Sequence, residues 1–432
     1  MSSVLPFDII DQIIDIVGEN KDIDLLKDLA LVSHSFLQIC TKHLFATVEL
    51  HGADSGGVPR RRVASSKKGF VKLLKSRPDV VKYIQKLTYK VEGTKWEYDG
   101  PCPQILSYPS FEYFDNDDHL LSPILANLLR TIPRLNCLTI TSSNLCWTSL
   151  DCSLKSAFLH LMHLPTINHI DLSHISDFPL SSHTLSVNLR RLDLSYMTLS
   201  DPLERDGSHE IVQSEMPKIR EFRSLESSQL AMKLLYAKWQ DGRSAFNFMD
   251  LRGLSMSFNW FQDERIIHYV LQNAKLLEKL HLSVGPGQSL VRLHDILSSS
   301  AHTLKVLGLT VPLCAFPLAL AGLCEGLEAM AGRYILEALS FEVQVDGHES
   351  EDFIGSTIQE VENVLVKPGW SGLRKASFKV SIACCMVTRV KITDLFEALQ
   401  SLPDKYLTRL SKLESVTIDY SAYSKCALYH GD

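Results

Sequence analysis

A short pattern of apolar residues recurs along most of this chain and limits the folds that it can adopt. The pattern is L-x-x-L-x-L, in which other aliphatic or aromatic residues can replace leucine, and successive copies begin 22 to 51 residues apart. Ten copies lie at Ile84-Leu87-Tyr89, Leu135-Leu138-Ile140, Ile167-Ile170-Leu172, Leu189-Leu192-Leu194, Leu251-Leu254-Met256, Leu277-Leu280-Leu282, Leu304-Leu307-Leu309, Leu336-Leu339-Phe341, Leu373-Ala376-Phe378 and Leu413-Val416-Ile418. A weaker copy begins with Ile219 and Phe222 and has Ser224 in its last apolar position.

The alternation inside each copy is typical of a short β-strand, because successive side chains of a strand point to opposite faces of its sheet. Helical spacing appears between the copies, at 120–132, 154–164, 229–239, 263–273 and 351–366. A strand and a helix of this size cannot bury their apolar sides alone, so neighbouring units must stack around one shared core. We therefore predict an α/β solenoid of strand–helix units with a curved parallel sheet.

This pattern resembles that of leucine-rich-repeat proteins over residues 83–420. The Asn or Cys that follows the strand in that family is mostly missing here, and the spacing is irregular. The alternative is an ordinary α/β domain whose strands are rich in leucine. The resemblance implies that residues 83–432 form the solenoid.

The first fifty residues follow a different pattern and are predicted to form a separate helical unit. Apolar residues have helical spacing from Ile9 to Val17 and again from Leu25 to Cys40, with a break at 18–22, and a strand is predicted at 47–50. Pro6 suits the start of a helix, because its missing amide donor would have no partner there. Three such short helices cannot form a stable core unaided, so the rest of the chain or a partner must cover them.

These residues are similar to the F-box motif. Its opening Leu-Pro and following acidic residue are matched by Leu5-Pro6 and Asp8. The Val-Ser-x-x-Phe of its third helix is matched by Val32-Ser33-His34-Ser35-Phe36. An F-box followed by leucine-rich repeats is a recognised combination, so each resemblance supports the other.

The F-box resemblance implies a surface that docks a Skp-type adaptor, which would link the chain to a cullin–RING ubiquitin ligase. The residues that it assigns to adaptor binding are Leu5, Pro6, Ile9, Ile10, Ile13, Ile14, Leu25, Leu29, Val32 and Phe36. Equally, these side chains could pack on the first repeat as an N-terminal cap, which solenoids need.

Charge is distributed unevenly near the N-terminus. Residues 1–50 hold eight acidic residues and three lysines, a net charge of −5, whereas residues 54–90 hold eleven basic and two acidic residues, a net charge of +9. We predict that residues 51–82 form a basic linker with a bridging helix between the F-box-like residues 1–50 and the solenoid. The whole chain has a net charge of −6, so a chain-wide basic surface for nucleic acid is not expected.

The chain lacks the common sequence motifs of catalysis and metal binding. It has no phosphate loop, nucleophile elbow, zinc-binding helix motif or dinucleotide fingerprint, and no two cysteines have C-x-x-C spacing. A Cys–His pair could form only through space, and no motif indicates which residues would form it. We therefore predict no catalytic residue, cofactor or metal site.

Features of the chain favour the cytoplasm, the nucleus or both. The first twelve residues contain no Lys or Arg, which argues against a signal peptide, and ten cysteines are too few for a disulfide framework in a chain of 432 residues. The uncharged stretch 306–324 is long enough to span a membrane. Its glycines and prolines predict instead a strand, a turn at Pro312 and the start of a helix, so no membrane contact is expected.

The sequence therefore predicts a non-catalytic substrate receptor of an SCF-type ubiquitin ligase. An unidentified target protein would be bound by outward-facing residues of the strands, and the candidates are His169, Asp171, Arg191, Asp193, Glu221, Arg223, Lys279 and His281. A solvated sheet face without any target would have the same polar residues. Two further functions are compatible with the sequence: a leucine-rich-repeat scaffold outside ubiquitination, and a hydrolase-like α/β enzyme with a site assembled through space.

Overall fold

The structure is a computed structural model, and it describes twelve stretches of the chain. These are residues 7–51, 65–91, 116–179, 185–198, 217–227, 247–258, 261–285, 290, 293–312, 322–345, 350–382 and 389–424. The chain divides into two compact units, Met1–Pro217 and Lys218–Asp432.

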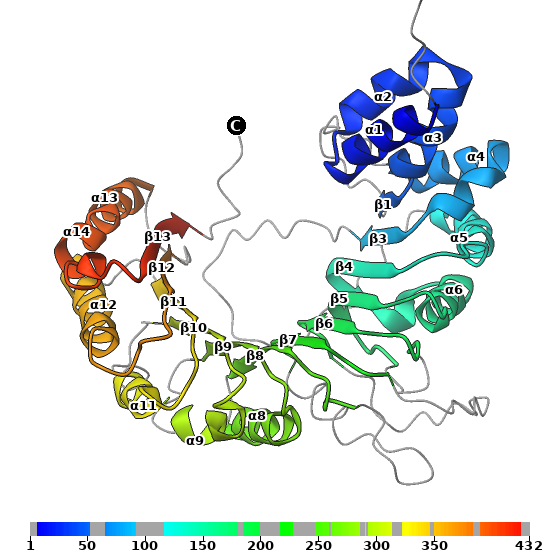
Figure 1. The fold of residues 1–432 in the computed structure, drawn as a ribbon. Coiled ribbons are helices and arrows are strands. Elements are labelled where there is room, and N and C mark those ends of the chain that lie inside the picture. Colours follow the sequence, from blue (N-terminus) through cyan, green and yellow to red (C-terminus); the bar gives the residue numbers. More distant parts are fainter. Residues whose placement is uncertain are drawn as a thin grey trace, which may run out of the picture. The chain divides into compact units, whose positions relative to one another are not determined.

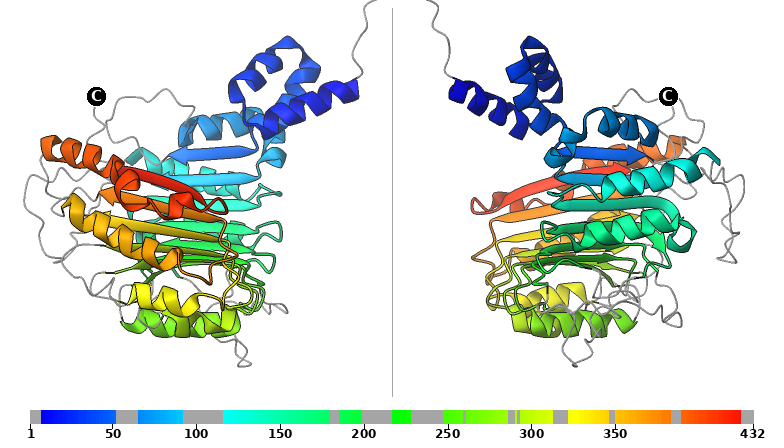
Figure 2. Two further views of the ribbon diagram at one scale, coloured as in Figure 1. Left: turned by 60° about the vertical axis from the view of Figure 1, so that its left-hand side comes forward. Right: turned by 90° about the vertical axis from the view of Figure 1, so that its right-hand side faces the viewer.

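Three helices open the first unit: α1 (Phe7–Glu19), α2 (Ile23–Val32) and α3 (His34–Leu44). Asp22 caps α2 by accepting a hydrogen bond from the Leu25 amide at 3.1 Å. Ser33 caps α3 in the same way through the Phe36 amide at 3.3 Å, which gives the Val-Ser-x-x-Phe pattern a structural reason. In the two views of Figure 2 these helices form a group of their own before the first strand.

The sheet of the first unit consists of parallel strands in the order β6-β5-β4-β3-β1-β2. Their bounds are β1 (Thr47–His51), β2 (Ser65–Ser66), β3 (Lys86–Val91), β4 (Cys137–Cys146), β5 (His169–Ser176) and β6 (Arg191–Ser195). Helices α4 (Lys67–Ser76), α5 (Asn116–Leu129) and α6 (Cys152–His163) lie on one face of this sheet (Figure 1). Short 3-10 helices at Pro78–Tyr83 and Trp147–Ser149 complete the unit.

The second unit repeats this arrangement with strands in the order β13-β12-β11-β10-β9-β8-β7, again all parallel. The strands are β7 (Glu221–Leu225), β8 (Gly253–Phe258), β9 (Lys279–Val284), β10 (Val306–Pro312), β11 (Ala338–Val345), β12 (Lys375–Ile382) and β13 (Thr417–Ser424). One face carries α8 (Phe261–Asn273), α9 (Leu293–Leu297), α11 (Leu323–Met330), α12 (Glu351–Leu365), α13 (Arg389–Gln400) and α14 (Leu402–Tyr406) (Figure 1). Two 3-10 helices lie at Ser298–Ser300 and Leu410–Lys412.

The recurring apolar pattern forms the core of both units, as predicted. Equivalent positions stand beside one another across the strands: Leu87 pairs with Leu138, and Leu254 with Leu280. From Ile84 to Leu194 every pattern residue is at most 1% exposed, and from Ile219 to Phe378 at most 3%. The protein is thus of the α/β class, with strand–helix units stacked around a continuous apolar core in each unit.

The last copy of the pattern differs from the prediction. Leu413 is 37% exposed, and Val416 and Ile418 are only half-buried. Within the described residues no further strand–helix unit follows β13, so nothing completes the core on that side. The sequence pattern predicts the strand, but it does not predict whether another strand–helix unit covers the strand's apolar side chains.

Several predicted segments can be located. Ser65–Ser66, inside the basic stretch 54–90, forms the short strand β2 beside β1, and helix α4 lies within residues 51–82. The uncharged stretch 306–324 begins with β10, as expected, but the prediction of a turn at Pro312 is wrong, because β10 extends through Pro312, which pairs with Gln344. Helix α11 begins near the end of the stretch. The predicted helix at 229–239 lies outside the described residues. Among the helices that the structure describes, none is both long and apolar enough to cross a membrane.

Candidate functional site

Helix α1 has two apolar faces, and only one of them is buried. Ile14 is 1% exposed and packs with Leu26, Ile39 and Cys40 in a small core shared by the three helices. On the other face Ile9, Ile13 and Ile16 are 43%, 47% and 58% exposed. These three residues, the α1 stripe, are spaced four and three apart and therefore lie along one side of the helix.

Helix α2 adds further exposed apolar side chains. Leu31 is 86% exposed and Val32 66%, and Ile23 and Leu25 are each 41% exposed. Large apolar side chains gathered on a small helical unit are unusual on a surface that only meets water. The described residues of this chain leave them open to a partner.

The residues assigned to adaptor binding fall into three groups. Ile9, Ile13, Leu25 and Val32 are exposed. Ile14 belongs to the core of the three helices, and Ile10, Leu29 and Phe36 pack against that core. Leu5 and Pro6 lie outside the described residues.

Ile16, Ile23 and Leu31 are exposed as well, although the F-box resemblance did not select them. The available signal was that α1 is apolar on both faces, since a helix of a small soluble unit has one apolar stripe facing its core. A second stripe on such a helix indicates a second contact surface.

Charged side chains fix α1 against α3 and thereby hold the stripe outward. Lys42 lies 2.7 Å from Asp15 and 3.2 Å from Asp11, and Nε2 of His43 lies 2.7 Å from Asp15. The hydrogen bond from Lys42 outweighs burial and keeps the pKa of Asp15 below its usual value, with His43 adding to the effect. A side chain at Gly18 would meet the His43 ring, with its Cβ 2.2 Å from Nδ1, so a glycine is needed at this close approach.

The second group of predicted residues lies on the sheet faces away from the helices. In the first unit the structure brings His169, Arg191 and Asp193 together. Oδ2 of Asp193 is 3.2 Å from Nε2 of His169 and 2.9 Å from both Nε and Nη2 of Arg191. Asp193 is only 5% exposed, contrary to the expectation of an accessible target contact, because its two partners cover it. Asp171, in register with Asp193 on the next strand, is half-buried.

The protonation of this group follows from its contacts. Burial disfavours the charged form of His169, but hydrogen bonds to Asp193 and to Cys137 outweigh burial and raise the pKa of His169 to about 9. Burial would raise the pKa of Asp193, yet His169 and Arg191 hold it below the usual value. At neutral pH the group is therefore an imidazolium and a guanidinium that share one carboxylate.

In the second unit the predicted residues are more dispersed. Glu221 and Arg223 on β7 and Lys279 on β9 are exposed. His281 lies across β10, where its Nε2 is 3.2 Å from Oγ1 of Thr310. A Cβ at Gly308 would lie 2.3 Å from Nδ1 of His281, so this glycine makes room for the ring.

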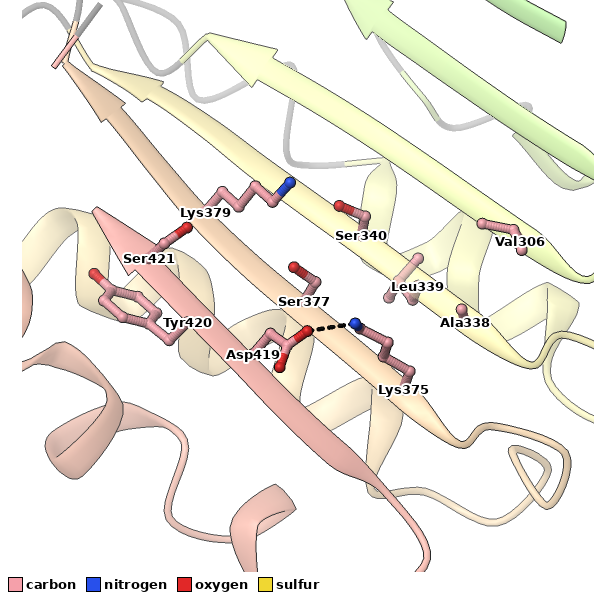
Figure 3. Close-up of a pocket in the computed structure, with 10 residues that line it drawn as sticks. All are labelled: Val306, Ala338, Leu339, Ser340, Lys375, Ser377, Lys379, Asp419, Tyr420 and Ser421. Carbon is pink, nitrogen blue, oxygen red and sulfur yellow. Dashed lines mark ion pairs between the residues drawn. The ribbon is translucent and has the colours of Figure 1, made fainter. Parts of the chain in front are cut away.

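A hollow of about 450 Å³ lies on the same sheet face, over β10 to β13 (Figure 3). Its floor consists of small side chains from neighbouring strands, including Ala338, Ser340 and Ser377. Lys375 and Asp419 form an ion pair at 2.5 Å along one side. Lys379 extends over the other side, in register with Glu342 and Ser421.

This hollow was not predicted from the sequence. The signal was present as small residues at outward positions of adjacent strands, namely Ser340 and Ser377, which stand in register. Glu342 beside them is held in place, since it accepts hydrogen bonds from Ser381 and Tyr423, each at 2.9 Å. The hollow is therefore a shaped depression with charged side chains at its edges, and it could receive a side chain of a bound protein.

No group of three or more His, Cys, Asp or Glu residues in the described stretches is arranged to hold a metal ion. When the chain was compared with models of known protein families and with curated proteins, neither comparison gave a match.

Proposed function

We propose that this chain is a substrate-recognition adaptor of an SCF-type cullin–RING ubiquitin ligase. Helices α1–α3 dock a Skp-type adaptor, and the strand faces of the repeats hold a target protein. The observation that carries this proposal is the α1 stripe, a row of isoleucines that the three-helix unit leaves exposed on its surface.

The energetics support docking over capping of the first repeat. Full burial of an isoleucine side chain contributes roughly 1.5–3 kcal/mol. The stripe residues are about half exposed, so roughly half of that contribution is still available if a partner buries them. If the stripe capped the first repeat, its side chains would already be buried against that repeat. Ile14, Leu26, Ile39 and Cys40 form a core that needs no contribution from the stripe, so the stripe is available for a partner.

The mechanism is one of proximity. The helices attach the chain to the ligase, and the repeats keep the target near the ubiquitin-charged enzyme, which raises the local concentration of the target's lysines. The hollow over β10 to β13 suits an anchoring side chain of the target. A scaffold outside ubiquitination would use the same surfaces but would not bind the adaptor.

A double substitution on the stripe tests the proposal. Ile9→Asp combined with Ile13→Asp places two charges on the surface that the adaptor would bury, and burying an unpaired charge is costly. We expect the affinity of the purified full chain for a Skp-type adaptor, measured by titration calorimetry, to fall by at least about tenfold.

The matched control is Ile335→Asp. Ile335 is an isoleucine of the second unit with 46% exposure, close to the 47% of Ile13. It should bind the adaptor as the unchanged chain does. If the stripe variant stays folded and binds as tightly as this control, or if the unchanged chain does not bind, the proposal is wrong.

A further inference from the structure

Cys137 lies in a row of basic side chains on the open sheet face of the first unit. Lys86, Cys137, His169 and Arg191 are register partners on the adjacent strands β3, β4, β5 and β6. Their chain neighbours Leu87, Leu138, Ile170 and Leu192 are buried in the core, so the row faces outward. Side chains of register partners on adjacent strands stand about 5 Å apart.

The contacts of Cys137 resemble those of a paired nucleophile and base. Its Sγ lies 3.3 Å from Nδ1 of His169, while the other ring nitrogen of His169 is bonded to the buried carboxylate of Asp193. A thiol, an imidazole and an orienting carboxylate in series form the arrangement that activates sulfur nucleophiles. Because Cys137 and Asp193 bind opposite nitrogens of the ring, the three side chains cannot share one metal ion.

We propose that Cys137 is a modification site, a nucleophilic thiol that forms a mixed disulfide with a small anionic disulfide such as glutathione disulfide. The imidazolium of His169 donates a hydrogen bond to the sulfur through Nδ1. Asp193 and Arg191 hold the ring in that orientation.

The reaction is a thiol–disulfide exchange in which atoms and electrons balance. The Cys137 thiol loses its proton to solvent, because the His169 ring is already protonated, Sγ bonds to one sulfur of the disulfide, and the bond between the two disulfide sulfurs breaks. The released thiolate takes up a proton from solvent and leaves as a thiol. Cys137 is oxidised to the mixed disulfide, and the departing half of the small disulfide is reduced.

The surroundings of Cys137 fit exchange better than acyl transfer. Acyl transfer needs backbone or side-chain donors for an oxyanion. The Cys137 amide already donates to the Gln85 carbonyl at 3.1 Å, and the His169 amide to the Asn136 carbonyl at 3.1 Å. Exchange at sulfur develops no oxyanion, so the occupied backbone is no obstacle to it.

The charges of the row select the kind of disulfide. Lys86 and Arg191 are exposed on the two sides of the Cys137–His169 pair. Basic side chains at this spacing favour carboxylate-bearing ligands. A disulfide with carboxylates should therefore react faster than a neutral one of similar size.

The test is the rate of adduct formation at individual cysteines of the purified full chain, followed by peptide mass mapping with glutathione disulfide as the probe. Cys146 is the control inside the same chain. Its Sγ donates a hydrogen bond to the carboxylate of Asp177 at 3.4 Å and lies 2.9 Å from Oγ1 of Thr148, so its contacts are with oxygen atoms and not with an imidazole. We expect Cys137 to be modified at least about tenfold faster than Cys146.

Two variants separate the contribution of His169 to the rate from that of the basic residue Lys86. His169→Gln should slow modification of Cys137 by about tenfold and leave Cys146 unchanged. Lys86→Gln, at an exposed position, should slow the reaction with glutathione disulfide more than the reaction with neutral hydroxyethyl disulfide. Melting curves establish that both variants are folded. Equal rates at Cys137 and Cys146, or an unchanged rate at Cys137 in the folded His169→Gln variant, would overturn the proposal.

Discussion

His169 makes the stability of the first unit depend on pH. Its folded-state pKa of about 9 lies above the ordinary value of 6.5, because Asp193 and Cys137 favour the charged ring despite its burial. A raised pKa contributes stability that is complete below pH 6.5 and is lost as the pH rises through about 9. We expect the melting temperature to fall between pH 6.5 and 9, as measured by circular dichroism.

The variant His169→Asn provides the comparison, because it lacks the titrating ring. The gap between its melting temperature and that of the unchanged chain should be widest near pH 6 and should close as the pH approaches 9. A gap that stays constant over this range would show that His169 does not carry the charge inferred from its contacts with Asp193 and Cys137.

The sequence predicted that His169, Arg191 and Asp193 face outward, but it did not predict that they contact one another. His169, Arg191 and Asp193 were recognised as outward-facing because alternation along a strand is a local property. Their contacts with one another and with Cys137 depend on the lateral register of three strands, whose pattern copies begin at 135, 167 and 189. Spacing along the chain does not determine which side chains on neighbouring strands contact one another. The burial of Asp193 by His169 and Arg191 therefore could not be predicted from the sequence.

At the scale of the strands, the pattern leucines are expected to carry the stability of each unit. Leu192 in β6 and Leu280 in β9 are both 1% exposed; Leu192 stands beside Ile170 of β5, and Leu280 beside Leu254 of β8 and Leu307 of β10. Truncation to alanine leaves a cavity in a packed core, so Leu192→Ala and Leu280→Ala should each lower the free energy of unfolding by about 2–5 kcal/mol. Denaturant unfolding measures this loss.

Leu413→Ala is the control for these two variants. It removes the same atoms from a pattern leucine, but Leu413 is 37% exposed, so it should cost less than either core variant. Three equal losses would mean that the pattern itself, and not burial, accounts for the effect.

Strand positions could be predicted from the sequence because the pattern is short and its periodicity is local. The pairing of β1 was harder to foresee. It was expected only as a strand after the helices, yet it pairs with β3, with Val48 beside Leu87 and Leu50 beside Tyr89. Phe45-Val48-Leu50 is a further copy of the pattern, and the transition from helical spacing at 25–40 concealed it.

For the molecule as a whole, the described surfaces suggest a division of tasks. Exposed apolar side chains gather on α1 and α2, whereas the open sheet face of the second unit contains the hollow, with Lys375, Lys379 and Asp419 around it. Apolar helical surfaces suit a stable partner, and a hollow edged by charged side chains suits recognition of particular side chains. If adaptor and target bind at these separate places, each contact can be removed without loss of the other.

Filling the hollow is the sharpest test of that separation. Ser377 stands on its floor and points away from the core, so Ser377→Trp should occupy the hollow without disturbing Ala376 or Phe378, which face the core. We expect quantitative proteomics of the tagged full chain, with the proteasome inhibited, to show loss of one or more partners while the Skp-type adaptor is retained. The variant with Asp at positions 9 and 13 should show the converse, because its hollow is intact.

Ser195→Trp, on the open side of β6 in the first unit, adds the same bulk outside the hollow and should keep both classes of partner. If Ser377→Trp leaves the partner list unchanged, the target binds elsewhere, and reversal of Arg191 and Arg223 to Glu would then examine the outward charges of β6 and β7.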